Sequence, residues 1–104
     1  MESRLLESVL KEFLAHLSGR QREESLARIG ELLAEEDRYR GLSLTSGLDS
    51  EDDRAAVTRG FFGRWAKLDP WAVSGHLALM PEGRLRAEAT AAVAAARYRL
   101  EHRS

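Results

Sequence analysis

The chain has 104 residues, of which 43% are hydrophobic and 32% are charged, so it can fill one core and still solvate its surface. Its net charge is −1, and Lys and Arg alternate with Asp and Glu, which does not favour a nucleic-acid binder. The chain has no cysteine, which excludes disulfide bonds and thiolate metal sites.

The first seventeen residues carry apolar side chains at three- and four-residue steps, which is typical of one stripe on an α-helix. Gly19 follows the stripe and predicts the helix end. Charged residues interrupt it, so it resembles neither a signal peptide nor a membrane span. We therefore expect a cytoplasmic protein with no membrane association. The stripe consists of Leu5, Leu6, Val9, Leu10, Phe13, Leu14 and Leu17.

A second amphipathic helix is predicted from Gln21 to Asp37, with apolar residues at Leu26, Ile29, Leu32 and Leu33. The short link between the two helices predicts an antiparallel helical hairpin over residues 1–38. Residues 39–50 combine glycine, serine and threonine, which predicts a loop. Its leucines, Leu42, Leu44 and Leu48, are expected to pack onto the hairpin.

Three helices are predicted in the second half of the chain. Asp49 or Ser50 caps the first, which begins at Glu51. Asp69 and Pro70 start the second, because aspartate suits the N-cap and proline the first helical position. The third follows the break at residues 81–83 and runs from Arg84 to His102. The core-facing rows of the first and third helices are Val57, Phe61, Trp65 and Leu68, and Leu85, Ala89, Val93, Ala96 and Leu100.

These elements predict an all-α fold of four to five helices in a single domain over residues 1–104. It divides into the N-terminal hairpin (1–38), the loop (39–50) and a helical-repeat-like half (51–104). Two architectures remain open, a compact bundle and a short, solenoid-like helical-repeat stub.

The second half shows weak internal similarity. An offset of 32 residues aligns Arg54 with Arg86, Thr58 with Thr90 and Phe61 with Val93. Residues 61–83 also resemble the W-A-x-x-D-P helical-hairpin repeat unit of large, mostly uncharacterised bacterial helical-repeat proteins. The resemblance implies stacked helix pairs and offers no catalytic residue to carry over. Met80 is an insertion relative to that unit. The matching positions are Phe62, Trp65, Ala66, Asp69, Pro70, Ala72, Leu79, Pro81 and Gly83.

The polar residues do not assemble a recognisable active site. His16, His76 and His102 lack metal-ligand spacing to other ligands. Two acidic clusters are expected at helix ends, where solvation and capping explain them. We therefore predict no catalytic residue, cofactor, metal or small-molecule substrate. The acidic clusters are Glu35, Glu36 and Asp37, and Glu51, Asp52 and Asp53.

The remaining feature is aromatic. Trp71 and Tyr98 point away from the core-facing rows of their helices, and together with Phe62 they are candidates for an exposed partner-binding surface. The alternative is that they pack against residues 41–48 or the first helix.

We thus expect a non-enzymatic protein-interaction or self-association module, with a protein partner or a second copy of the chain. A second hypothesis is a DNA-associated regulator that uses residues 51–104 as a helix-turn-helix variant. Its phosphate contacts would be Arg59, Arg64, Arg84 and Arg86. A small helical enzyme is the third and least supported hypothesis.

Overall fold

The computed structural model describes the backbone of residues 2–102 and the side chains of residues 8–102. Within that range it has six helices and no strand, which confirms the all-α prediction but exceeds the four to five helices expected. Their bounds are α1 (Glu2–Ala15), α2 (Gly19–Glu36), α3 (Arg38–Gly47), α4 (Glu51–Leu68), α5 (Pro70–Leu79) and α6 (Arg84–Glu101).

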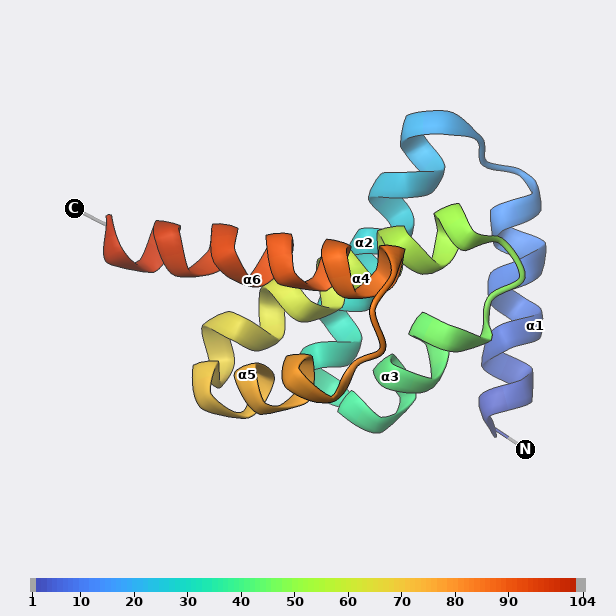
Figure 1. The fold of residues 1–104 in the computed structure, drawn as a ribbon. Coiled ribbons are helices and arrows are strands. Elements are labelled where there is room, and N and C mark those ends of the chain that lie inside the picture. Colours follow the sequence, from blue (N-terminus) through green and yellow to red (C-terminus); the bar gives the residue numbers. More distant parts are fainter. Residues whose placement is uncertain (1, 103–104) are drawn as a thin grey trace.

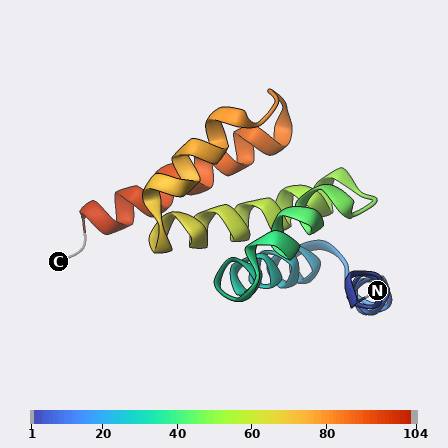
Figure 2. The ribbon, with the colours of Figure 1, turned by 90° about the horizontal axis from the view of Figure 1, so that it is seen from below.

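Helix α4 is the centre of the molecule. It lies between α5 and α6 on one side and α2 and α3 on the other, while α1 lies at the outer edge (Figures 1 and 2). Its side chains are accordingly buried on nearly all sides. Val57, Phe61 and Trp65 are buried as predicted, whereas Leu68, at its last turn, is partly exposed. Leu100 is likewise exposed, because the C-terminal part of α6 extends past its neighbours (Figure 1).

Helix α3 corrects the prediction of a loop over residues 39–50, since only residues 48–50 connect it to α4. The side chain of Asp37 caps α3 by accepting a hydrogen bond from the backbone N–H of Arg40, at 3.2 Å. Gly41 lies directly on the ring of Phe61, where a Cβ atom would overlap it. Tertiary packing therefore outweighs the weak helix propensity of glycine, serine and threonine in this segment.

The buried side chains form two clusters. One joins the C-terminal half of α4 to α5 and α6 through Phe61, Phe62, Trp65, Val73 and Val93. The other joins α1, α2, α3 and the N-terminal half of α4, and it includes Leu44 and Leu48, whose packing against the hairpin is thereby confirmed. Leu42 packs against the first cluster. The remaining large members of the second cluster are Leu10, Leu14, Leu26 and Val57.

Helices α2 and α4 approach each other closely at two glycines. A Cβ atom on Gly60 would overlap the carbonyl of Ala27, and a Cβ atom on Gly30 would overlap the carbonyl of Val57. Only glycine permits this separation of the two backbones.

The chain reverses direction at the predicted signals. Ser50 caps α4 and Asp69 caps α5, each accepting a hydrogen bond from the backbone N–H three residues later. Pro70 occupies the first turn of α5. Gly83 and Gly19 adopt φ values of 150° and 55°, which favour glycine, at the starts of α6 and α2. Helix α1 ends earlier than predicted, at Ala15, so Gly19 begins α2 and does not end α1.

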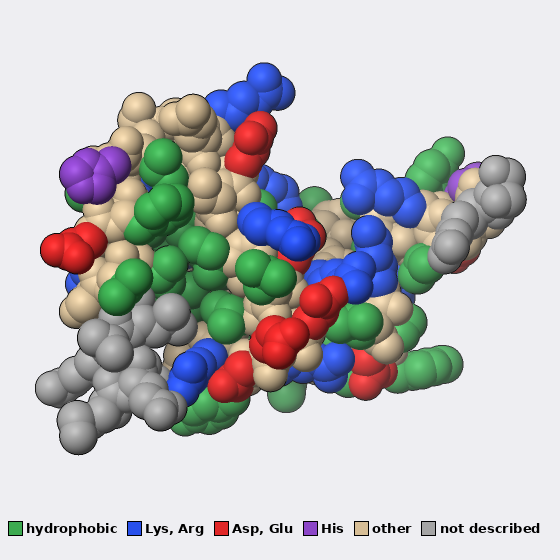
Figure 3. All heavy atoms as spheres, turned by 180° about the vertical axis from the view of Figure 1, so that it is seen from behind, with side chains coloured by type: hydrophobic (Ala, Val, Ile, Leu, Met, Phe, Trp, Pro, Cys, Tyr) green, Lys and Arg blue, Asp and Glu red, His purple; other side chains and the backbone are tan. Residues whose placement is uncertain are grey.

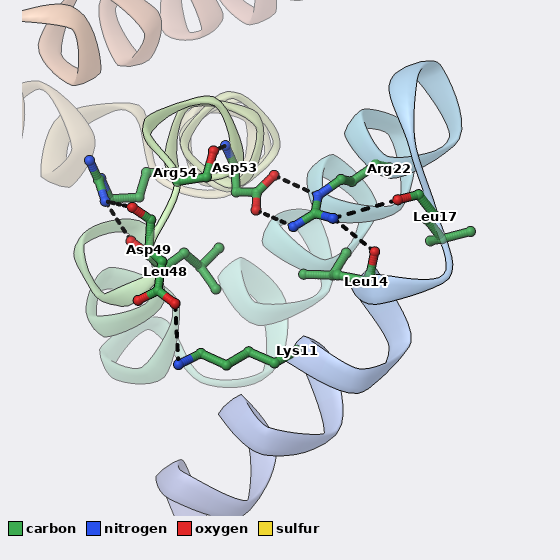
Figure 4. A network of polar contacts seen from close by, with 9 residues as sticks. Lys11, Leu14, Leu17, Arg22, Leu48, Asp49, Asp53 and Arg54 are labelled. Atoms are coloured by element: carbon green, nitrogen blue, oxygen red, sulfur yellow. Dashed lines mark hydrogen bonds and ion pairs between the residues drawn. The ribbon is translucent and has the colours of Figure 1, made fainter.

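An ion pair joins the first turn of α4 to the first turn of α2 (Figure 4). The guanidinium of Arg22 donates two hydrogen bonds to the carboxylate of Asp53, at 2.9 and 2.6 Å. It also donates to the carbonyl oxygens of Leu14, at 2.8 Å, and Leu17, at 3.5 Å. The hydrogen bonds to Asp53 raise the pKa of Arg22.

Helix α1 runs opposite to α2 (Figure 1) but buries only part of its predicted stripe. Leu10 and Leu14 are buried, while Val9 and Phe13 are exposed. Leu5 and Leu6 lie outside the described side chains. The outer position of α1 explains the difference, because it has neighbours on one side only.

Candidate interaction surface

Helix α5 has an exposed apolar face. The ten residues of this helix include no Lys, Arg, Asp or Glu. At 100° per residue, its exposed positions other than Pro70 fall on one side, opposite the buried Val73. Two large exposed residues lie near the two ends of the helix: Trp71 is 89% exposed and Leu79 is 83% exposed. We refer to Trp71, Ala72, Gly75, Ala78 and Leu79 as the α5 face.

Helix α5 is held firmly against its neighbours. Val73 is fully buried, and Leu77 and Met80 pack against the same core cluster. Arg97 of α6 also donates hydrogen bonds to two residues of α5, to the carbonyl of Pro70, at 3.4 Å, and to the hydroxyl of Ser74. The α5 face is therefore presented by an anchored helix.

The structure separates the predicted partner-binding residues. Trp71 is exposed and belongs to the α5 face. Tyr98 is 62% exposed but lies on α6, where its ring stacks on His102 with ring centroids 3.9 Å apart. The alternative, in which these two rings are buried against residues 41–48 or α1, does not hold.

Phe62 is only 1% exposed, so the prediction that it contributes to an exposed surface is wrong. Its ring packs between Phe61, Trp65 and His76, with centroid separations of 5.2, 5.7 and 5.7 Å. His76 comes from α5, which folds back over this side of α4. The sequence shows Phe62 off the main core-facing row of α4, but not that α5 covers it.

Sequence reasoning missed Leu79. Leu77 packs against the core, and Leu79 lies two residues from it, on the opposite side of the helix. The same helical geometry that selected Trp71 could have selected Leu79.

The polar side chains considered for chemistry take part in folding contacts. Asp53 binds Arg22, and Glu51 and Asp52 bind Arg84, whose pKa these hydrogen bonds raise. Glu35 pairs with Arg64, and Asp37 caps α3. No group of His, Asp and Glu that could hold a metal ion occurs in the part of the chain that the structure describes.

The arginines of the DNA-binding hypothesis are mostly engaged within the protein. Arg64 and Arg84 form the ion pairs described above, and Arg86 donates a hydrogen bond to the carbonyl of Met80, at 3.2 Å. Arg59 has no such partner among the described residues, and it lines a groove between α2, α4 and α6 together with Arg64.

Comparison with protein-family models, curated proteins and solved structures finds no significant match. The resemblance of residues 61–83 to a bacterial helical-repeat unit therefore stays a prediction. Within residues 2–102, no helix is long and apolar enough to cross a membrane.

Proposed function

We propose that this protein is a helical protein-interaction module without enzymatic activity, and that it docks through the α5 face. The observation that carries the proposal is the pair of almost fully exposed large apolar side chains, Trp71 and Leu79, on one side of an uncharged helix. Keeping such a surface in water is unfavourable, and tryptophan is strongly enriched at the energetic centres of protein interfaces.

The shape of the α5 face suits a helix as the partner element. Between the two large side chains lie Ala72, Gly75 and Ala78, which leave room for another backbone to approach closely. The contacts of Val73 and Arg97 anchor α5 before any partner binds, which lowers the entropy lost on association.

Other exposed apolar side chains offer a weaker case. Val9 and Phe13 lie one turn apart on α1, but each is only about half exposed, at 54% and 50%. Tyr39 is strongly exposed but lies between Arg38 and Arg40 in the sequence of α3. Exposed apolar residues of this kind are ordinary on protein surfaces. The α5 face differs because no charged side chain interrupts it.

The test is size-exclusion chromatography with light scattering over a dilution series of the full chain and the Trp71→Ala variant. We expect a concentration-dependent dimer that the variant weakens about 1,000-fold, because each of the two copies loses a tryptophan hot spot of ~2 kcal/mol. Tyr39→Ala is the control, because it removes another strongly exposed aromatic ring without touching the α5 face.

If the chain stays monomeric, affinity capture with the wild-type and Trp71→Ala proteins asks whether the partner is a different protein. A protein retained by the wild type and by Tyr39→Ala, but not by Trp71→Ala, supports the proposal. A monomer that retains no such protein contradicts it.

A further inference from the structure

The groove between α2, α4 and α6 has a volume of about 380 Å³, within the size range of small-molecule sites. Seven of its thirteen lining residues are glycine or alanine, including Gly63 of α4 and Ala92 and Ala95 of α6. The groove is therefore wide enough for a ligand with an apolar body. It is independent of the α5 face, because none of the residues of that face line it.

Three unpaired cations of the described part of the chain lie in the groove. Arg59, Lys67 and Arg99 all line it, and among the described side chains they are the only Lys or Arg without a hydrogen-bond, ion-pair or ring partner. Figure 3 shows Lys and Arg side chains, intermixed with Asp and Glu, near the centre of the molecule seen from behind, where α6 begins to project. Each of the other described Lys and Arg side chains has a hydrogen-bond or ion-pair partner. These residues are Lys11, Arg20, Arg22, Arg28, Arg38, Arg40, Arg54, Arg64, Arg84, Arg86 and Arg97.

Helix geometry places two of these cations at one end of the groove. Arg84 of α6 binds Asp52 of α4, and Arg97 binds the carbonyl of Pro70, so the two helices run in the same direction. Lys67 and Arg99 therefore lie toward the same end. Each of these two cations also interacts favourably with the partial negative charge at the C-terminus of its own helix. Arg59, in the middle of α4, has no such interaction.

The local charge indicates which ligand would fit. Two further lining residues are neutralised within the protein, Arg64 by Glu35 and Glu31 by Arg28. The carboxylate of Glu88 offsets one of the three unpaired cations, which leaves two positive charges in excess. A phosphomonoester carries −1.5 to −2 charges near pH 7 and accepts several hydrogen bonds from Lys and Arg.

We propose that this groove binds a small molecule that carries a phosphomonoester group on an apolar body. The anionic group lies at the Lys67 and Arg99 end, and the body lies over the glycine and alanine surface. This ligand goes beyond the interaction function and departs from the expectation of no small-molecule partner.

Phenyl phosphate is the probe, titrated into the full chain by isothermal titration calorimetry. We expect saturable binding with a dissociation constant of about 1 mM or lower, weaker binding of inorganic phosphate, which lacks the body, and none of phenol, which lacks the charge. The affinity for phenyl phosphate falls as the pH is lowered from 7.5 to 5.5, because the phosphate group loses its second negative charge near pH 6 while Lys and Arg stay protonated.

Two pairs of variants locate the site. Arg99→Gln or Lys67→Gln weakens binding about fivefold, whereas Arg20→Gln, the same charge change at an exposed residue of α2 outside the groove, leaves it unchanged. Ala95→Leu fills the groove and abolishes binding, whereas Ala94→Leu, next to it but outside the groove, does not. Circular dichroism confirms that each variant is folded.

The proposal is overturned if phenyl phosphate does not saturate the chain, or if Arg20→Gln weakens binding as much as Arg99→Gln does. It is equally overturned if Ala95→Leu binds as well as Ala94→Leu. Dimerisation through the α5 face is measured separately, so either proposal can fail without the other.

Discussion

At the scale of single residues, two neighbouring carboxylates in the first turn of α4 lie in different environments. The side chain of Asp53 is 10% exposed and binds Arg22 with two hydrogen bonds. The side chain of Asp52 is 78% exposed and binds Arg84 at the surface. Both carboxylates have a favourable interaction with the helix dipole, so the difference between them isolates the effect of the buried ion pair.

We predict that Asp53→Asn lowers the free energy of unfolding by about 1–2 kcal/mol, since it leaves the partly buried Arg22 without its carboxylate. Asp52→Asn should leave stability nearly unchanged, because an exposed ion pair contributes little. Urea denaturation followed by circular dichroism measures both variants. Equal losses in the two variants would contradict the assigned role of the Arg22–Asp53 pair.

At the scale of helices, two glycines that both lie inside a helix differ in the space around their Cβ positions. Gly60 lies against the backbone of α2 at Ala27, while Gly75 on α5 has open space around its Cβ position. Both are inside helices, where glycine is intrinsically unfavourable relative to alanine. Packing therefore decides the effect of an added methyl group.

We predict that Gly60→Ala destabilises the fold by about 2–3 kcal/mol, because α2 and α4 must move apart. Gly75→Ala should stabilise it by about 0.5–1 kcal/mol through the helix propensity of alanine. Thermal unfolding of dilute samples, in which association through the α5 face is minimal, gives the comparison. A neutral Gly60→Ala would show that the two helices do not depend on this close approach.

At the scale of the whole molecule, stability is unevenly distributed. Helices α2, α3, α5 and α6 all pack on α4, whereas α1 lies at the edge with exposed apolar side chains (Figure 2). Segments with few buried contacts open more often than the core does.

We predict that the backbone amides of α4 exchange with deuterium most slowly and those of residues 9–15 in α1 fastest among the helices. Hydrogen exchange followed by mass spectrometry or NMR measures this order. Equal protection of α1 and α4 would mean that the chain opens as one cooperative unit.

Several features followed from the sequence because their causes are local. The caps at Ser50 and Asp69 and the break at residues 81–83 depend on side-chain and backbone chemistry within a few residues. The exposure of Trp71 follows from its position opposite Val73 on one helix. These signals do not depend on any neighbouring helix.

Other features required the tertiary structure. Residues 38–47 form a helix because their leucines pack against α1, α2 and α4, although their propensity indicates a loop. Phe62 is buried because α5 folds over it, and Arg59, Lys67 and Arg99 share one groove because α4 and α6 run side by side. Sequence alone determined which faces of the five predicted helices are apolar and where most of these helices begin and end. Only the packing of the helices decided which of those faces are covered, because burial depends on contacts between residues that are distant in the chain.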